Sequence, residues 1–113
     1  MEQYVTLIVN RKDEFEVKDK VNRVSSVYGN ILLFSDIEEM IKITLYNAPL
    51  EELLSIATYY VKKQSSRKVE FLSQGQDARI EASSKNIDEV IKEIKNSQSG
   101  LTQHLVIQFI DSQ

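Results

Sequence analysis

The stretch from Tyr59 to Lys68 gathers the side chains of this sequence that best suit the binding of an anion. Two tyrosines are followed by four cations, and no acidic residue lies between Glu52 and Glu70. Cations contact phosphate groups, and aromatic rings stack on bases. The stretch therefore predicts a polyanion-binding site made of Tyr59, Tyr60, Lys62, Lys63, Arg67 and Lys68.

The same basic residues have a second interpretation that needs no ligand. Lys62 and Lys63 would end a helix, where positive charge offsets the negative end of the helix dipole. The net charge of −3 and the pI near 5.2 are also not typical of a dedicated nucleic-acid-binding protein. We therefore keep a nucleic-acid-binding or small-ligand-binding regulatory module as the alternative to a protein-binding domain.

Catalytic signatures are weak in this chain. His104 is the only histidine, and it lies on an expected strand without a neighbouring group to orient it as an acid or base. Three glycines are too few for a phosphate-binding loop or a dinucleotide fingerprint, and cysteine is absent. The acidic residues around Asp36 and Glu51 do not have the spacing of a calcium loop. We expect a protein without enzymatic activity, metal or cofactor.

The composition is that of one folded domain spanning residues 1–113. Hydrophobic residues make up 42% and charged residues 27%, as in ordinary globular proteins. Glu2 stands where a signal peptide would carry a basic residue, and the apolar runs are too short to span a membrane. Together with the absence of cysteine, these features predict a cytoplasmic protein.

The stretch from Met40 to Lys63 organises the expected fold. Apolar residues occupy every second position from Ile41 to Leu45, which is the pattern of a half-buried strand. Pro49 suits the first turn of a helix, and apolar residues recur at helical spacing from Leu50 onward. This unit should form the centre on which the other elements pack.

Before this unit, Gln3 to Val9 reads as a strand. The segment from Asp13 to Tyr28 fits a helix in which Asp13 is the N-cap and Glu16 the capping-box acid, although the alternation from Phe15 also fits a strand. Ile31 to Phe34 reads as a short strand. The turn from Ser35 to Glu39 lacks glycine, so a helical turn is an alternative there.

After the central unit, the pattern predicts a hairpin, a helix and a final strand. The first hairpin strand contains Val69 and Phe71, the turn contains Gly75, and the return strand runs from Ala78 to Ala82. The helix begins at the N-cap Asn86 and should bury Ile87, Val90, Ile91 and Ile94, and the final strand runs from Leu101 to Ile110.

The resulting order, β-α-β-β-α-β-β-α-β, indicates an α+β fold with a mixed, mostly antiparallel sheet and helices on one face. The first two thirds of this order match a ferredoxin-like arrangement. The pattern from Arg67 to Asn96 (strand, turn with Gly75, strand, capped helix) resembles the C-terminal part of small adaptor domains that accompany bacterial caspase-like and TIR-type effectors. That resemblance implies an adaptor role and assigns no site residues.

With no catalytic signature and a well-formed core pattern, we expect a small microbial protein-interaction domain, either an adaptor or a regulatory module. Val106 and Ile110 lie on the opposite side of the last strand from Leu105 and Ile107, so burying one pair exposes the other. A second copy is a common cover for such a strand. We therefore expect a homodimer in which Leu105, Val106, Ile107 and Ile110 contribute to self-association.

Overall fold

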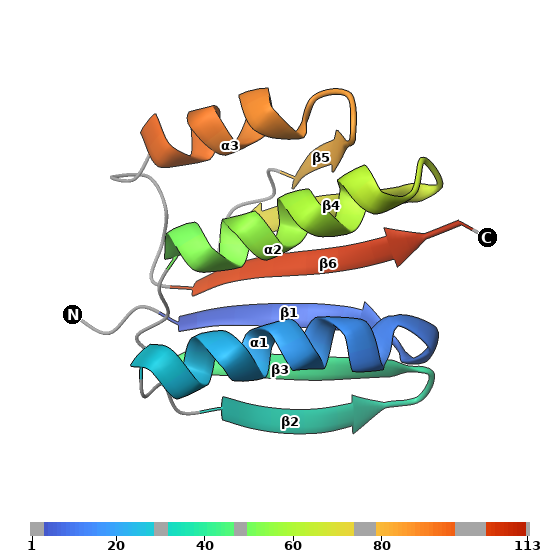
Figure 1. Ribbon diagram of the computed structural model, residues 1–113, viewed down its shortest axis with the longest axis vertical. Coiled ribbons are helices and arrows are strands. Elements are labelled where there is room, and N and C mark those ends of the chain that lie inside the picture. The colour runs from blue at the N-terminus through green and yellow to red at the C-terminus, as the bar shows by residue number, and fades with distance from the viewer. Residues whose placement is uncertain (1–3, 29–31, 47–49, 74–78, 97–103, 113) are drawn as a thin grey trace.

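The structure, a computed structural model, describes residues 4–28, 32–46, 50–73, 79–96 and 104–112. Its elements follow the expected order, with one added 3-10 turn (Figure 1). They are β1 (Tyr4–Asn10), η1 (Arg11–Asp13), α1 (Glu14–Tyr28), β2 (Leu32–Ile37), β3 (Met40–Tyr46), α2 (Leu50–Lys63), β4 (Arg67–Ser73), β5 (Arg79–Ser83), α3 (Ile87–Asn96) and β6 (His104–Asp111).

The six strands form one mixed sheet in the order β2-β3-β1-β6-β4-β5. Among the strands in the described ranges, only the central pair, β1 and β6, is parallel, and the other neighbours are antiparallel. The expected α+β class with a mostly antiparallel sheet is thus confirmed. The ferredoxin-like comparison holds for the order of elements along the chain, whereas in the sheet β6 lies between β1 and β4.

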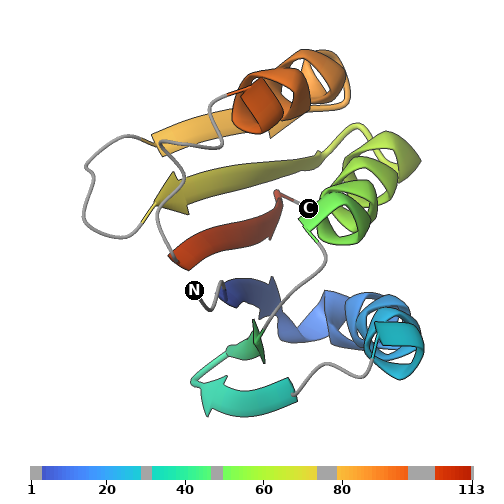
Figure 2. The ribbon, with the colours of Figure 1, turned by 90° about the vertical axis from the view of Figure 1, so that its left-hand side faces the viewer.

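Each half of the sheet contains a split β-α-β unit. On one side, β3 lies between β1 and β2, and on the other side β4 lies between β6 and β5. Helix α2 crosses the centre and contacts β4 and β6, while α1 packs beside β1 and α3 beside β5. All three helices lie on the same face of the sheet, as Figure 2 shows edge-on.

The core lies between this face and the helices because alternate strand residues point toward them. Every second position of β1, β3 and β6 is buried, and α2 contributes six buried residues. The strand positions are Val5, Leu7 and Val9, then Ile41, Ile43 and Leu45, and then Leu105, Ile107 and Phe109. The other set of strand residues therefore points to the face that no described helix covers.

Two expected details of the first half are corrected or settled. The segment after Asp13 is the helix α1, not a strand. Asp13 does not act as a simple N-cap, because it lies in η1 and its two carboxylate oxygens are engaged by Tyr60 and Arg67. Its partner in the expected capping box, Glu16, likewise bonds to Arg67.

The alternative of a helical turn around Asp36 is wrong, because β2 continues to Ile37 and pairs with Met40 across a two-residue turn. Glu38, the first residue of that turn, has φ 52°. A left-handed backbone of this kind is normally given to glycine, which explains why the sequence left a helical turn open as an alternative to the turn between the two strands.

Helix α3 begins where predicted, and the carbonyl of Asn86 accepts the first helical hydrogen bond from Val90 at 3.0 Å. The side-chain oxygen of Asn86 accepts a hydrogen bond from the backbone N–H of Ser83. Ile91, which was expected in the core with its neighbours, is only half-buried. The predicted turn around Gly75 lies outside the described residues. In the part of the chain that the structure describes, no helix is both long enough and apolar enough to cross a membrane.

Candidate functional site

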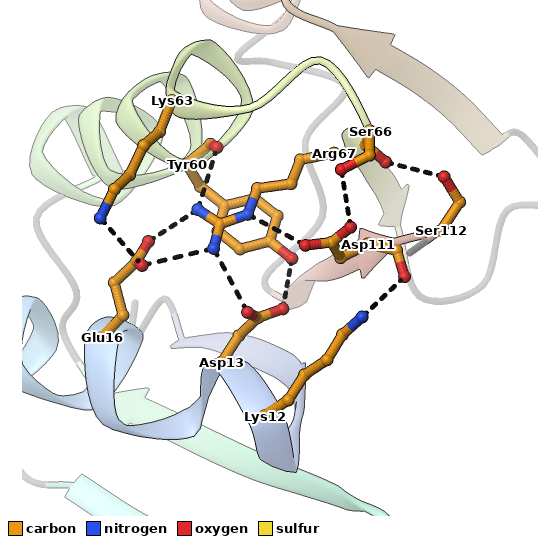
Figure 3. Close-up of polar contacts among 9 residues, drawn as sticks. All are labelled: Lys12, Asp13, Glu16, Tyr60, Lys63, Ser66, Arg67, Asp111 and Ser112. Carbon is orange, nitrogen blue, oxygen red and sulfur yellow. Dashed lines mark hydrogen bonds and ion pairs between the residues drawn. The ribbon is translucent and has the colours of Figure 1, made fainter.

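A group of interacting charged side chains lies where β1 and β6 end side by side (Figure 3). In open sheets, the crevice beyond the carboxyl ends of adjacent parallel strands is a common ligand site. Asp13 follows β1 in η1, and Asp111 is the last residue of β6. The guanidinium of Arg67, from the start of β4, contacts both carboxylates, which makes this place the first candidate site.

Arg67 is 4% exposed and uses all five of its N–H donors within the chain. Nε donates to Asp111 Oδ2 at 3.3 Å, and Nη2 donates to Asp13 Oδ1 at 3.3 Å and to Glu16 Oε1 at 3.3 Å. Nη1 donates to Glu16 Oε2 at 2.8 Å and to the Tyr60 carbonyl at 3.4 Å. A guanidinium has five donors and no acceptor, so nothing is left for a ligand.

The charges around Arg67 shift the pKa of the groups that they touch. Burial alone would raise the pKa of Glu16, but hydrogen bonds and charge from Arg67 and Lys63 hold it below its ordinary value. Burial alone would lower the pKa of Arg67, but its bonds with Glu16 and Asp111 raise it. Each partner therefore stabilises the ionised form of the other.

Tyr60 completes the group from α2. Its hydroxyl donates to Asp13 Oδ2 at 2.7 Å, and its ring lies 4.2 Å from the central carbon of the Arg67 guanidinium. The ring also packs edge-on against Phe109, with centroids 4.9 Å apart. Burial, and then the bond to the Asp13 carboxylate, raise the pKa of the Tyr60 hydroxyl. The phenol is thus held protonated as a donor and is not poised as an acid or base.

Asp111 is also satisfied by neighbours. The Ser66 hydroxyl donates to its other oxygen at 2.8 Å, and Lys12 donates to its carbonyl at 3.4 Å. Ser112 bonds back to the carbonyl of Ser66. The whole group, which we call the Arg67 cluster (Asp13, Glu16, Tyr60, Arg67 and Asp111), therefore joins η1, α1, α2, β4 and β6. Its geometry is that of a structural ion cluster.

The predicted polyanion-binding residues do not form one surface. Arg67 and Tyr60 are buried in the Arg67 cluster. Lys62 pairs with Asp88 at 3.1 Å, and Lys63 pairs with Glu16 at 3.3 Å. Lys68 points to the opposite face of the sheet and pairs with Glu81 at 3.3 Å.

Tyr59, the remaining member of that set, is 46% exposed and lies under the ammonium of Lys20, at 3.6 Å from the ring centroid. It lines a shallow groove of about 250 Å³ between α1 and α2. The rest of this groove is formed by Lys20, Arg23, Val24, Glu52, Ser55 and Ile56. Of the two cations in this groove, Arg23 pairs with Asp19 and Lys20 lies over the Tyr59 ring, and Glu52 adds a negative charge, so the net charge offered to an anion is small.

The helix-free face of the sheet is a second candidate site. It carries the strand residues that alternate with the core, and many of them are apolar and only half-buried. We define this face by Ile8 on β1, Met40, Lys42, Thr44 and Tyr46 on β3, Val106, Gln108 and Ile110 on β6, Lys68, Glu70 and Leu72 on β4, and Arg79 and Glu81 on β5.

The predicted self-association residues divide between the two faces. Leu105 and Ile107 are at most 2% exposed and pack under the helices. Val106 and Ile110 lie on the helix-free face and are half-buried. Because β6 is paired on both sides, it has no free edge for a partner strand.

His104 begins β6 and pairs with Tyr4 in the sheet.

Neither candidate site contains an obvious centre for metal chemistry. Within the described ranges, no three side chains of the ligand-forming types are grouped so as to hold a metal ion. Comparison with known proteins adds no assignment, since no family model, curated protein or solved structure matches the chain.

Proposed function

We propose that this chain is a small, non-enzymatic protein-interaction domain that binds its partner through the helix-free face of its sheet. The observation that carries the proposal is the distribution of the helices. All three lie on one face, and the other face presents apolar side chains such as Ile8, Leu72, Val106 and Ile110. A sheet face exposed only to water would alternate to polar residues there.

The Arg67 cluster also supports this proposal, because it occupies the other candidate site. The place where a ligand would sit in a related sheet architecture is filled by the chain's own guanidinium, and every donor of that group is in use. The pairing of Lys62, Lys63 and Lys68 with acids likewise gives little support to a nucleic-acid-binding role. The lack of cysteine suits a cytoplasmic adaptor or regulatory domain.

The experiment is a capture assay with tagged protein in an extract of the organism that makes it. The test variant combines Val106→Lys with Ile110→Lys on the helix-free face. The matched control combines Ser55→Lys with Asn96→Lys, which adds the same charge at exposed positions on the helices. We expect a partner, or additional copies of the chain, to be retained by the wild type and the control and lost from the test variant.

Thermal unfolding of both variants would establish that they are folded before the assay. If the test variant is folded and retains every protein that the wild type retains, the helix-free face is not the binding surface and the proposal fails. Retention that is lost equally in both variants would contradict it as well.

A further inference from the structure

Resting on the proposed function, we infer that the partner of the helix-free face is a second copy of this chain. The two sheets pack face to face about a two-fold axis that runs along the strands, between β1 and β6. In this arrangement β1 lies over β6 of the other copy, β3 over β4, and β2 over β5.

The directions of the strands permit this packing. Reading across the sheet, β2, β1, β6 and β5 run one way, and β3 and β4 run the opposite way. This order is the same from either edge. A two-fold axis along the strands therefore stacks each strand on one that runs in the same direction, which is the aligned packing of a β-sandwich, with an angle of about −30°.

The charges on the face favour this axis. One row across the sheet reads Ser35, Lys42, Ile8, Gln108, Glu70 and Glu81. Lys42 and Glu70 stand on strands that are equally far from the midline, at about 7 Å each. Glu70 is 8% exposed and pairs with Arg79 on β5 at 3.3 Å, so Lys42 of the other copy would be a second cation beside this carboxylate. The proposed axis brings Lys42 of one copy over Glu70 of the other, and the symmetry makes this contact twice.

An axis across the strands would have the opposite effect. It would stack each strand on itself, so that an axis at this row would bring Lys42 toward the second Lys42, whereas the charge of Glu70 is offset by its ion pair with Arg79. Facing like charges oppose association. The charge pattern thus selects one of the two simplest face-to-face packings.

The apolar residues near the midline would meet small or neutral side chains. Val106 of one copy lies over the position of Thr6, which is itself only 1% exposed, and Ile110 lies over Asn10 when the register of β1 and β6 is continued by two residues beyond Ile8 and Gln108. Six strands of about seven residues give a face of about 600 Å² for each copy, from strand spacing and rise. The total of about 1,200 Å² is at the lower end of specific interfaces, which indicates a reversible dimer.

Sedimentation of the full chain at increasing concentration tests the state of association. We expect the mass to rise from 13.0 kDa toward twice that value. The variant Lys42→Glu should raise the dissociation constant about tenfold more than Lys42→Met does, since it places like charges over each other. A mass of 13.0 kDa throughout the micromolar to millimolar range would overturn the inference.

Crosslinking tests the axis. Because the chain has no cysteine, each introduced thiol is the one site that can react. Thr44→Cys and Leu72→Cys each introduce one thiol on the helix-free face, on strands β3 and β4. Under the proposed axis, Thr44 of one copy lies about 10 Å from Leu72 of the other, whereas two copies of Thr44 are about 17 Å apart, from the same sheet spacings. A short bismaleimide should therefore join the two variants when they are mixed, and should join neither variant to itself.

Crosslinking within a single variant would indicate an axis across the strands at the row of Thr44 and Leu72, and a dimer without crosslinks would indicate another position of the axis or another surface. Both results overturn the inference. The capture assay described above separates these failures from failure of the proposed function. A monomer that still captures another protein through Val106 and Ile110 leaves the function standing with a different partner.

Discussion

The hydroxyl of Tyr60 donates a 2.7 Å hydrogen bond to the carboxylate of Asp13, across 47 positions of the sequence. The same carboxylate bonds to Arg67 through its other oxygen. Because the Asp13 carboxylate is buried, these two donors replace the hydrogen bonds that water would otherwise give it. The contact joins α2 to the turn between β1 and α1, and it makes Tyr60 the residue whose change most directly reveals how much the Arg67 cluster contributes.

Replacing Tyr60 with Phe should lower the free energy of unfolding by about 1–3 kcal/mol, since a buried carboxylate loses a donor while the ring is kept. Urea unfolding at neutral pH measures this loss. Tyr59→Phe is the matched control, because that ring is 46% exposed. An equal effect of the two changes would show that the hydrogen bond contributes nothing specific.

Tyr60 should also make stability depend on alkaline pH. Its pKa is raised above the ordinary value of 10.0, so the folded state holds the proton more tightly than the unfolded state. The stabilisation is complete below about pH 10 and is lost as the pH rises toward the folded pKa. Tyrosinate absorbance should therefore show Tyr60 ionising only when the domain unfolds. If the absorbance change that precedes unfolding is smaller in Tyr60→Phe than in the wild type, Tyr60 ionises in the folded domain, and the prediction is wrong.

Replacing Arg67 with Met should cost about 3–5 kcal/mol, because it leaves buried carboxylates without their shared cation. Arg67→Lys should recover only part of the loss, since an ammonium does not reach three carboxylates as a planar fork does. Lys62→Met is the control, because its ion pair with Asp88 is exposed and should contribute less than about 1 kcal/mol. Full stability in Arg67→Lys would show that charge alone matters.

Glu16 should make stability depend on acidic pH. Its pKa lies below the ordinary value of 4.5, so the folded state binds the proton less readily than the unfolded state. The stabilisation is present above about pH 4.5 and is lost as the pH falls through the folded pKa. The stability gap between wild type and Glu16→Gln should therefore close below pH 4.5. In a Lys63→Met background the change should be smaller, and a gap that widens in acid would refute the assignment.

Replacing Glu38 with Gly should stabilise the domain by about 1 kcal/mol, since Glu38 has φ 52° and glycine adopts that conformation without strain. Glu39→Gly is the control. Within the described ranges, Glu38 is the one residue other than glycine with positive φ, so the control should be neutral or destabilising. Thermal unfolding of both variants distinguishes these results.

The sequence predicted those parts of the fold that depend on local pattern. The helix from Leu50 to Lys63 has the predicted bounds, because its apolar spacing, its proline and its terminal charges agree. The strand from Met40 was recognised for the same reason. The hairpin at Glu38 was harder to recognise, because its turn uses a residue type that does not normally mark a turn.

The Arg67 cluster was not predicted, because its members come together only through tertiary structure. Asp13 and Glu16 were recognised as acids at a helix start, and local rules assign such acids to capping. The local pattern groups Arg67 with the other cations of the predicted polyanion-binding site, since nothing near it in the sequence indicates that it turns inward. Asp111 carried no signal at all. The position of β6 between β1 and β4 is likewise a long-range property that no local pattern encodes.

That position of β6 has a consequence for the order in which the domain folds. The strands β2, β3 and β1 pair with one another, and so do β4 and β5, but the two groups share no strand pairing until β6 arrives. Pairing between segments so far apart along the chain carries a large loop-closure entropy and slows folding. During synthesis on a ribosome, β1 would pair with β3 early, but its other edge would stay unpaired until β6 is made. That edge is the place where a chaperone would find the nascent chain unpaired.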